Sequence, residues 1–403
     1  MPAPVRPSGT PVVITHAQRT PIGKFLGGFS DLSAADLGAS VVRSLLERAG
    51  VAPGLVGEVL FGNGRQAGGG PNLARQVAVR AGIPVASTAW TINMACGSGL
   101  KSILLAADSI RAGRVEVAVA GGAESMTRLP FLLPQMRQGH RLGHAPVVDA
   151  MYQDGFLCPM SKMLMGETAE KLARELSIPR RAQDEFALGS QHKCEAARRE
   201  GRFQAEIAPV RVPSKKGEVV IRLDEHPREG ATLEELSKLK PVFDAAQGSV
   251  TAGNSSGITD GAAAVLVMSE ERARQLGLEP LAWIGHAAEA GVEPAVMGLG
   301  PVPAVRKLER QNGLSAGDYG LIELNEAFAA QVLACQRELA LPMERVNVNG
   351  GAIALGHPIG ATGARIVVTL LSEMKRAGVE HGLATLCISG GLGLAVAFHA
   401  RPR

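Results

Sequence analysis

The sequence predicts an α/β fold built from two duplicated halves with an inserted segment between them. Strand-like and helix-like stretches alternate along most of the 403 residues, which is the pattern of a parallel sheet covered by helices on both faces. The order strand, glycine-rich turn, long helix, strand, Gly-Gly turn occurs twice, over 90–122 and again over 346–391. This repeat favours two similar α/β domains packed together, although any α/β chain shows some of this rhythm.

The first half alternates short apolar strands with amphipathic helices. Ser33 is a good N-cap for a helix that Gly50 ends. Pro71 is expected in the first turn of a second helix, and loops are expected at 21–32 and at Gly121 and Gly122. The expected strands are 12–14, 56–61, 88–94 and 115–120, and the expected helices are 33–49, 71–81 and 100–112.

Residues 124–251 are richer in proline, methionine and charge than their surroundings. We interpret them as an inserted loop domain, which often shapes a binding site. Within it we expect helices at 167–176 and 180–199 and a charged segment at 215–240. From residue 257 we expect strands at 262–268, 281–290, 320–324, 346–348, 383–388 and 394–398, and helices at 302–311, 326–339 and 358–377. The predicted domains are 1–123 with 252–278 (N-terminal half), 124–251 (inserted loop domain) and 279–403 (C-terminal half).

The composition argues against several classes of protein. Aromatic residues make up 3% and the net charge is +4 without a basic run, so no nucleic-acid partner is expected. No stretch of about 18 apolar residues predicts a membrane helix, and the proline-rich 1–8 lacks the core of a signal peptide. The five cysteines show no paired spacing, which predicts reduced thiols and a cytoplasmic location. No metal-binding motif is found.

Cys96 is the first candidate for chemistry. It follows an apolar run, precedes Gly97 and Gly99, and stands where a helix begins. The helix dipole and free N–H groups at such a position are expected to lower the thiol pKa and make a nucleophile. A buried core cysteine is the alternative, and this stretch by itself does not decide between them.

His357 lies between a glycine and a proline at the start of the long second-half helix. Its turn is the repeat counterpart of the Cys96 turn, so the two are expected to face each other. Histidine is the usual general base near neutral pH, and a Cys–His pair is the minimal set for thiolate catalysis.

Two further candidates follow expected strands. Asn325 either stabilises an oxyanion, directly or through a water, or is an N-cap with Glu326 in the first helical turn. Cys387 precedes a glycine-rich turn, where it either moves protons or is an inert core residue. The small polar turn 251–258 either contacts a ligand's amide-bearing arm or is an ordinary loop.

Taken together, these stretches resemble the thiolase family, the acetyl-CoA C-acyltransferases. The motifs occur in the family's order and spacing: NMACGSG at 93–99, NEAFA at 325–329, GGAIALGHPIGATGAR at 350–365 and CISGGLG at 387–393. Shorter matches at 20–25, 121–126 and 251–263 extend the likeness over nearly the whole chain. The resemblance implies a thiolase-like fold, with two βαβαβ-type halves in αβαβα layers and a loop domain that binds coenzyme A.

The resemblance also implies a two-step acyl transfer. Cys96 matches the nucleophile that carries the acyl group as a thioester, and His357 matches the base that activates it. Cys387 matches the acid/base at the methyl group of acetyl-CoA. Asn325 matches the residue that holds the water of one oxyanion hole, shared with His357, while the N–H groups of Cys96 and Ser389 match the second.

The implied reaction is reversible acyl transfer between 3-ketoacyl-CoA plus CoA and acyl-CoA plus acetyl-CoA. Coenzyme A and acetyl-CoA are substrates, and no covalently bound cofactor or metal is expected. Ser256 matches a position near the pantetheine arm and Arg228 one near the adenine nucleotide, while Met165, Met297 and Phe328 match the pocket lining. The family likeness further implies a homodimer or homotetramer and a place in fatty acid metabolism such as beta-oxidation.

Three positions depart from the family pattern. Ser389 stands where many members have glycine, and Leu164 stands where short-chain biosynthetic members often have histidine. His399 stands where an acidic residue is common, and we attach no function to it. Acyl chain length and physiological direction stay open.

Two other classes of protein were weighed. A related condensing enzyme that uses an acyl-carrier protein pairs its cysteine with two histidines, or with histidine and asparagine, and the presence of Cys387 argues against it. A non-catalytic acyl-CoA or lipid carrier would be expected to lack Cys96 or His357.

Overall fold

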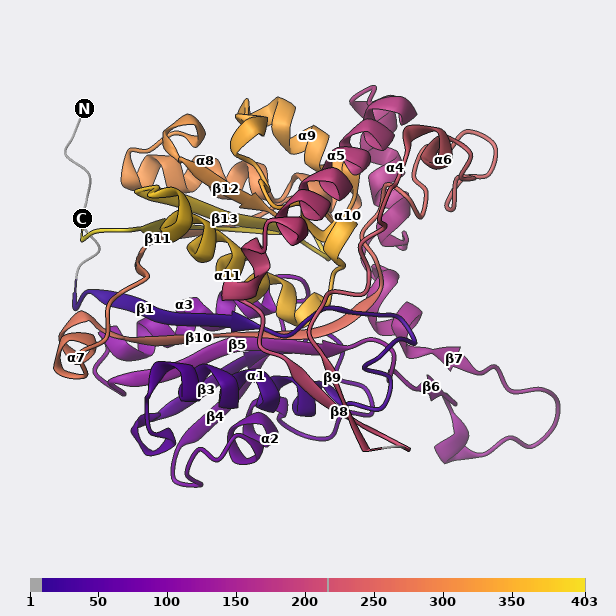
Figure 1. Cartoon of the computed structure of the whole chain (residues 1–403). Coiled ribbons are helices and arrows are strands. Elements are labelled where there is room, and N and C mark those ends of the chain that lie inside the picture. The colour runs from indigo at the N-terminus through magenta and orange to yellow at the C-terminus, as the bar shows by residue number, and fades with distance from the viewer. Residues whose placement is uncertain (1–8, 216, 403) are drawn as a thin grey trace.

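Two β-sheet halves stack in alternating layers with helices in this computed structural model, which describes residues 9–215 and 217–402 (Figure 1). Helices α1 and α2 cover the outer face of the first half, α8 and α9 cover the second, and α3 and α11 lie between the sheets. The predicted αβαβα layering is therefore confirmed. The expectation about residues 1–8 lies outside the described residues.

The elements that build the two halves are as follows. The first half contains β1 (Val12–Arg19), β2 (Gly23–Lys24), α1 (Ala34–Ala49), β3 (Glu58–Gly62), α2 (Leu73–Arg80), β4 (Thr88–Ile92), α3 (Ser98–Arg111), β5 (Val117–Ser125), β10 (Thr259–Ser269) and α7 (Glu270–Gln275). The second contains β11 (Ala282–Gly291), α8 (Pro301–Asn312), β12 (Leu321–Leu324), α9 (Ala329–Leu339), α10 (Ala352–Leu355), α11 (Ile359–Ala377), β13 (His381–Ile388) and β14 (Leu392–His399).

The strand order confirms the predicted duplication. In the first half the order across the sheet is β1-β10-β5-β3-β4, which is first, fifth, fourth, second, third along the chain. The second half repeats this order as β11-β14-β13-β12, with the segment at Val346 bridged in parallel to Ile322 in the last place. The halves meet where β1 pairs antiparallel with β11, Val13 opposite Trp283.

The local signals at α1 act as the sequence predicts. Ser33 is the N-cap, and its Oγ accepts from the Asp36 N–H while the Asp36 carboxylate accepts from the Ser33 N–H. This reciprocal pair satisfies two otherwise free donors. Gly50 ends the helix in the left-handed conformation, with φ of 63°, where glycine has no steric cost.

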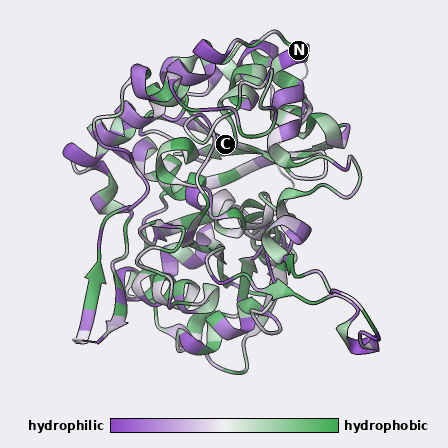
Figure 2. Cartoon of the chain, turned by 90° about the vertical axis from the view of Figure 1, so that its right-hand side faces the viewer, coloured by the Kyte–Doolittle hydropathy of each residue, from purple (hydrophilic) through white to green (hydrophobic). Residues whose placement is uncertain are grey.

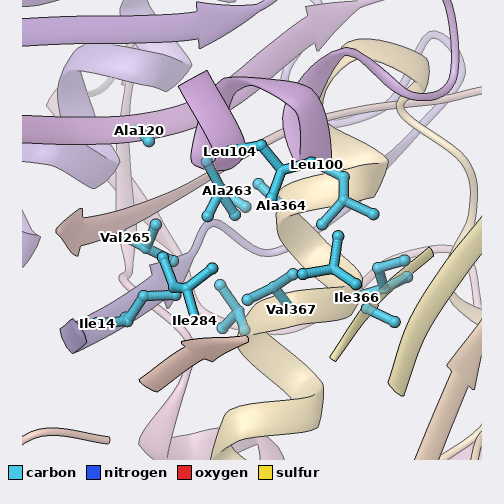
Figure 3. Close-up of a cluster of buried hydrophobic side chains, with 14 of the residues drawn as sticks. Ile14, Leu100, Leu104, Ala120, Ala263, Val265, Ile284, Ala364, Ile366 and Val367 are labelled. Atoms are coloured by element: carbon cyan, nitrogen blue, oxygen red, sulfur yellow. The ribbon is translucent and has the colours of Figure 1, made fainter. Parts of the chain in front are cut away.

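The core depends on the close approach of the two central helices. Side chains of α3 and α11 meet those of β1, β5, β10 and β11 in one buried cluster (Figure 3). A Cβ at Gly363 would stand 2.3 Å from the Leu100 N, so the helix backbones approach too closely for a side chain there. The buried residues labelled in Figure 3 are Ile14, Leu100, Leu104, Ala120, Ala263, Val265, Ile284, Ala364, Ile366 and Val367.

The predicted loop at Gly121 and Gly122 is wrong, because both residues lie inside β5. A Cβ at Gly122 would stand 2.0 Å from the Gly360 carbonyl oxygen of α11. These glycines therefore let a strand pack tightly under a helix, and they do not end the strand.

Three smaller predictions are also corrected. Pro71 precedes the N-cap Asn72 and so lies outside α2. Helix α9 begins at Ala329, three residues later than expected, with Phe328 at its N-cap. The segment 346–348 is no regular strand and makes only the isolated bridge at Val346, because the chain turns at once into the tightly packed glycine-rich segment.

The segment between β5 and β10 lies beside the layered body. It contains β6 (Phe131–Leu132), β7 (Val148–Asp149), α4 (Met165–Glu175), α5 (Arg180–Arg199), β8 (Val210–Ser214), β9 (Gly217–Ile221) and α6 (Leu233–Ser237). The stretch between β6 and β7 extends away from the body (Figure 1). Hydrophilic residues gather on the outer helices (Figure 2). Within 9–215 and 217–402, no helix is long and apolar enough to cross a membrane.

Candidate active site

Cys96 lies in a tight turn between β4 and α3. The turn is held by Ser98, whose Oγ accepts from the Met94 N–H at 2.8 Å and donates to the Ala95 carbonyl at 2.6 Å. Ala95 has a φ of 44°, an uncommon conformation for a residue with a side chain, and such strain tends to occur at functional sites. The turn therefore presents a buried thiol, 9% exposed, at the start of the central helix.

The expected lowering of the Cys96 pKa is wrong for the free protein. Burial raises the pKa of this thiol above its usual value, and the Arg65 guanidinium and the backbone N–H groups of Ser389 and Cys96 offset this only in part. The desolvation of a thiolate here outweighs the favourable charge and hydrogen bonds around it. Cys96 is therefore a protonated thiol at rest, and it needs a base to become a nucleophile.

His357 has the state that such a base requires. Burial, followed by the positive charges of Arg365 and Arg65, lowers the pKa of His357 to about 3. The imidazole is therefore neutral at physiological pH.

Thr362 assigns the tautomer of His357. The Thr362 hydroxyl donates to the Pro358 carbonyl at 3.0 Å, so its oxygen accepts from the Nδ1–H of His357 at 2.6 Å. Nε2 then carries the lone pair, and it is buried without a hydrogen-bond partner among the described residues. The imidazole is thus oriented with an acceptor available to take a proton.

Asn325 follows β12 directly, and its N–H donates to the Thr385 carbonyl at 3.1 Å. The N-cap alternative is wrong, because α9 begins at Ala329. The Asn325 side chain is 1% exposed, and neither its Oδ1 nor its Nδ2 has a partner in the described chain. A buried amide without partners is uncommon and indicates a place for a water or ligand.

Glu326 is also buried, and it braces this region. Its carboxylate accepts from Ser190 at 2.7 Å, Asn347 at 2.9 Å and the Ile353 N–H at 3.1 Å. It thereby links α5, the 346–348 segment and α10, the helix that ends two residues before His357.

Cys387 lies near the end of β13 and packs in a small apolar cluster with Met297 and Ala327. Burial raises the pKa of Cys387 well above its usual value, and the neighbouring Cys96 and Cys335 add to the shift. Cys387 is therefore a protonated thiol close to Cys96, a state in which it can donate a proton.

One cavity of about 250 Å³ gathers most of the predicted residues. Its wall includes Cys96, His357, Cys387, Ser389, Ser256, Met165, Leu164, Met297 and Phe328. The turn 251–258 reaches the cavity because the Ser256 N–H donates to the Ala327 carbonyl at 3.0 Å. Asn325 is not part of this wall, although Ala327, two residues further along the chain, is. Arg228 is exposed and outside the wall, with its Nη2 donating to the Ala252 carbonyl at 3.1 Å.

Sequence reasoning did not identify two charged residues of this region. Arg65 lines the cavity and is 7% exposed. Glu124 lies beneath it, where its carboxylate accepts from the N–H groups of Gly64 and Gly360 at 2.9 and 2.8 Å. A single arginine in a glycine-rich loop carries no signal of burial. Glu124 lies inside β5 and follows a run of small and apolar residues, 117–123, and this run is a weak signal of burial.

Comparisons with known proteins agree with this arrangement. The profile of the thiolase N-terminal domain matches residues 12–271, and that of the thiolase C-terminal domain matches 278–400. An acetyl-CoA acetyltransferase of Cupriavidus necator is 53% identical over 389 residues, covering 96% of this chain and 99% of the relative. An acetyl-CoA acetyltransferase of Pseudomonas aeruginosa is also 53% identical, over 386 residues, covering 96% and 98%.

Solved structures give the same result. The human mitochondrial 3-ketoacyl-CoA thiolase superposes with a TM-score of 0.94 at 40% identity, covering 97% of this chain and 99% of its own. The Bacillus anthracis acetyl-CoA acetyltransferase superposes with a TM-score of 0.94 at 45% identity, with the same coverage. The duplicated fold, its thiol and imidazole, and these matches define an acyltransferase. More narrowly, the chain belongs to the thiolase family.

Proposed function

We propose that the protein catalyses reversible acyl transfer between 3-ketoacyl-CoA plus CoA and acyl-CoA plus acetyl-CoA. The observation that carries this proposal is that one largely apolar cavity is lined by Cys96, His357 and Cys387 together. A neutral base and two protonated thiols in the wall of one cavity supply one nucleophile and two sites for proton transfer. The relatives' names support substrates from acetoacetyl-CoA to longer 3-ketoacyl-CoAs.

In the cleavage direction, His357 Nε2 takes the proton of the Cys96 thiol. The thiolate adds to the C3 carbonyl carbon of the 3-ketoacyl-CoA, and the ketone oxygen becomes an oxyanion. The C2–C3 bond then breaks, its electron pair goes to C2 of the leaving acetyl-CoA, and the Cys387 thiol protonates C2. The acyl group is left on Cys96 as a thioester, with Cys387 as thiolate and His357 as imidazolium.

The second step restores the protein. The Cys387 thiolate takes the proton of the CoA thiol, and the CoA sulfur attacks the thioester carbonyl carbon. The bond to Cys96 breaks, acyl-CoA leaves, and the Cys96 thiolate recovers its proton from His357. No proton or electron pair is left over at the end of the cycle.

Two groups of donors are proposed to stabilise the oxyanions. The N–H groups of Cys96 and Ser389 form one, and both already hydrogen-bond toward the Cys96 sulfur. The partnerless amide of Asn325 holds a water for the other, shared with the Nε2 of His357 once it is protonated. Ser389 replaces the family's usual glycine without loss of the backbone donor.

Coenzyme A is proposed to bind along the inserted loop domain, 124–251. The other two proposed domains are the N-terminal half, 1–123 with 252–278, and the C-terminal half, 279–403. Ser256 lies in the cavity wall, near where the pantetheine arm would end, and the exposed Arg228 is available to the nucleotide. Met165, Met297 and Phe328 bound the acyl pocket. We also propose a homodimer or homotetramer in the cytoplasm that serves fatty acid metabolism, with beta-oxidation as one role.

The direct experiment follows the absorbance of the Mg²⁺–enolate of acetoacetyl-CoA after CoA is added. The proposal predicts a CoA-dependent loss of signal, no loss with the Cys96→Ala variant, and a thioester adduct on Cys96 by mass spectrometry. If neither acetoacetyl-CoA nor longer 3-ketoacyl-CoAs are cleaved, the proposed function is wrong. If Cys96→Ala keeps activity, the nucleophile is wrong.

A further inference from the structure

Arg65 places a cation in the wall of a cavity that is otherwise mostly apolar. It follows β3 in the glycine-rich loop 63–70, and its guanidinium is anchored by Nη1 donating to the Gly64 carbonyl at 3.2 Å and Nη2 to the Gly155 carbonyl at 2.9 Å. Its Nε is buried with no partner in the described chain. A buried guanidinium that donates only to carbonyls and leaves its Nε–H without a partner is costly, unless a ligand completes its hydrogen bonds.

No carboxylate in 9–215 or 217–402 makes an ion pair with Arg65, although other buried arginines have one. Arg19 pairs with Glu206 and Asp224 at 2.6 Å each, and Arg365 pairs with Glu323 at 3.2 Å. Arg19 and Arg365 thus each form an ion pair with a buried carboxylate, whereas Arg65 does not.

Glu124 does not neutralise Arg65 in the same way. Its oxygens are occupied by the Asn63 amide at 2.5 Å and by backbone N–H groups, including that of Arg65. Burial raises the pKa of Glu124 to about 7, so this carboxyl carries only part of a negative charge at neutral pH. Glu124 therefore offsets the positive charge of Arg65 only in part, since burial raises the pKa of this carboxyl more than the charge of Arg65 lowers it.

The location of Arg65 says which part of a substrate would meet this charge. Arg65 lines the same cavity as Cys96 and His357, and its positive charge acts to lower the pKa of both groups. The acyl group bound to Cys96 must share the cavity with the guanidinium. A methyl-terminated chain would leave the cation desolvated and unpartnered, whereas a carboxylate would form charge-assisted hydrogen bonds with it.

We propose that Arg65 is a specificity-determining residue that selects 3-ketoacyl-CoA substrates whose acyl chain ends in a carboxylate. The inference rests on the proposed function and narrows its substrate class. Because Arg65 lies near Cys96, the selected chains are short, leaving a group such as succinyl or glutaryl on the thiol.

The test compares matched pairs of substrates in the cleavage direction. 3-Oxoadipyl-CoA ends in a carboxylate, and 3-oxohexanoyl-CoA is its methyl-terminated counterpart of equal length; 3-oxopimelyl-CoA and 3-oxoheptanoyl-CoA form a second pair. For the unmodified protein we expect kcat/KM to favour a carboxylate member by about tenfold or more, which equals about 1.4 kcal/mol. Arg65→Gln should abolish this preference, and Arg65→Lys should retain part of it because it retains the charge.

Two controls make the result decisive. Arg181→Gln changes an arginine on the outer surface of α5 and should keep the preference. Acetoacetyl-CoA, with the smallest acyl group, reports the basic reaction. If it is cleaved but neither pair shows a preference, or if Arg65→Gln lowers both members of each pair equally, the inference is overturned and the proposed function stands. If the unmodified protein cleaves none of these substrates, the proposed function itself fails.

Discussion

The tautomer of His357 is the most direct point at which to test the proposed chemistry. Replacing Thr362 with valine removes the oxygen that accepts from Nδ1–H at 2.6 Å while keeping nearly the same shape. A buried donor left without its partner costs about 1–3 kcal/mol. The ring can avoid this cost by moving its proton to Nε2, which then no longer accepts the proton of Cys96.

The expected result follows from that energy. If the cost appears in the activation barrier, kcat/KM for acetoacetyl-CoA cleavage falls about 5- to 150-fold, since each 1.36 kcal/mol is tenfold. Alkylation of Cys96 by iodoacetamide at neutral pH should slow as well, because the same base activates the thiol toward both reagents. Initial rates and the alkylation rate are the two measurements.

Thr369→Val is the matched control. Thr369 lies on the same helix, is buried, and donates its hydroxyl to Glu206 at 3.3 Å, outside the cavity wall. It should lower the melting temperature with little effect on kcat/KM. If Thr362→Val keeps its activity within twofold of the unmodified protein, or if both variants lose the same activity, Thr362 does not position His357 and the assigned tautomer is wrong.

Three further predictions concern protonation, proton transfer and packing. Because the pKa of His357 is lowered to about 3, the base stays neutral as pH falls through 6.5. The pH profile of kcat/KM should therefore show no titration of His357 near pH 6.5. A fall in kcat/KM near that pH which disappears when His357 is substituted would contradict this. Cys387→Ala should lower carbon–carbon cleavage about 10²- to 10⁴-fold, the usual contribution of a positioned acid. It should also slow the transfer of an acetyl group from acetyl-CoA to Cys96, followed by mass spectrometry, because the proposed mechanism has Cys387 protonate the departing CoA sulfur. An unchanged rate of adduct formation would show that Cys387 acts only at the carbon–carbon bond. Gly122→Ala should lower the unfolding free energy by about 1–3 kcal/mol or more through overpacking, because its Cβ would stand 2.0 Å from a carbonyl oxygen of α11. Gly189→Ala in α5 has open space around it and should raise the unfolding free energy by about 0.5–1 kcal/mol. Chemical denaturation measures both, and equal effects would refute the packing argument.

Features that depend on neighbours along the chain were predictable. Helix α5 spans Arg180–Arg199, the bounds that the sequence predicted, and α1 follows from its capping residues. The duplicated order was also readable, because each half repeats the same succession of elements. Cys96, Asn325 and Cys387 were found through their position after strands, His357 through its place at a helix start in the repeat, and all four through motifs of the thiolase family.

Features that depend on segments far apart in the sequence were not predictable in the same way. Gly121 and Gly122 look like a turn in isolation, and only the passage of α11 over β5 explains why glycine is required inside a strand. Asn325 resembles an N-cap until the start of α9 at Ala329 is known.

The sequence by itself determined the fold class, the succession of elements and the residues able to do chemistry, because capping, periodicity and motif spacing are local properties. Only the tertiary structure decided their state. A thiol at a helix start is expected to have a lowered pKa, but burial among residues from both halves raises it at Cys96 and lowers that of His357. Desolvation depends on every group packed around an atom, and most of those groups are distant in the chain. For the same reason Arg65, an ordinary loop residue in the sequence, becomes the cation of the cavity in the folded protein.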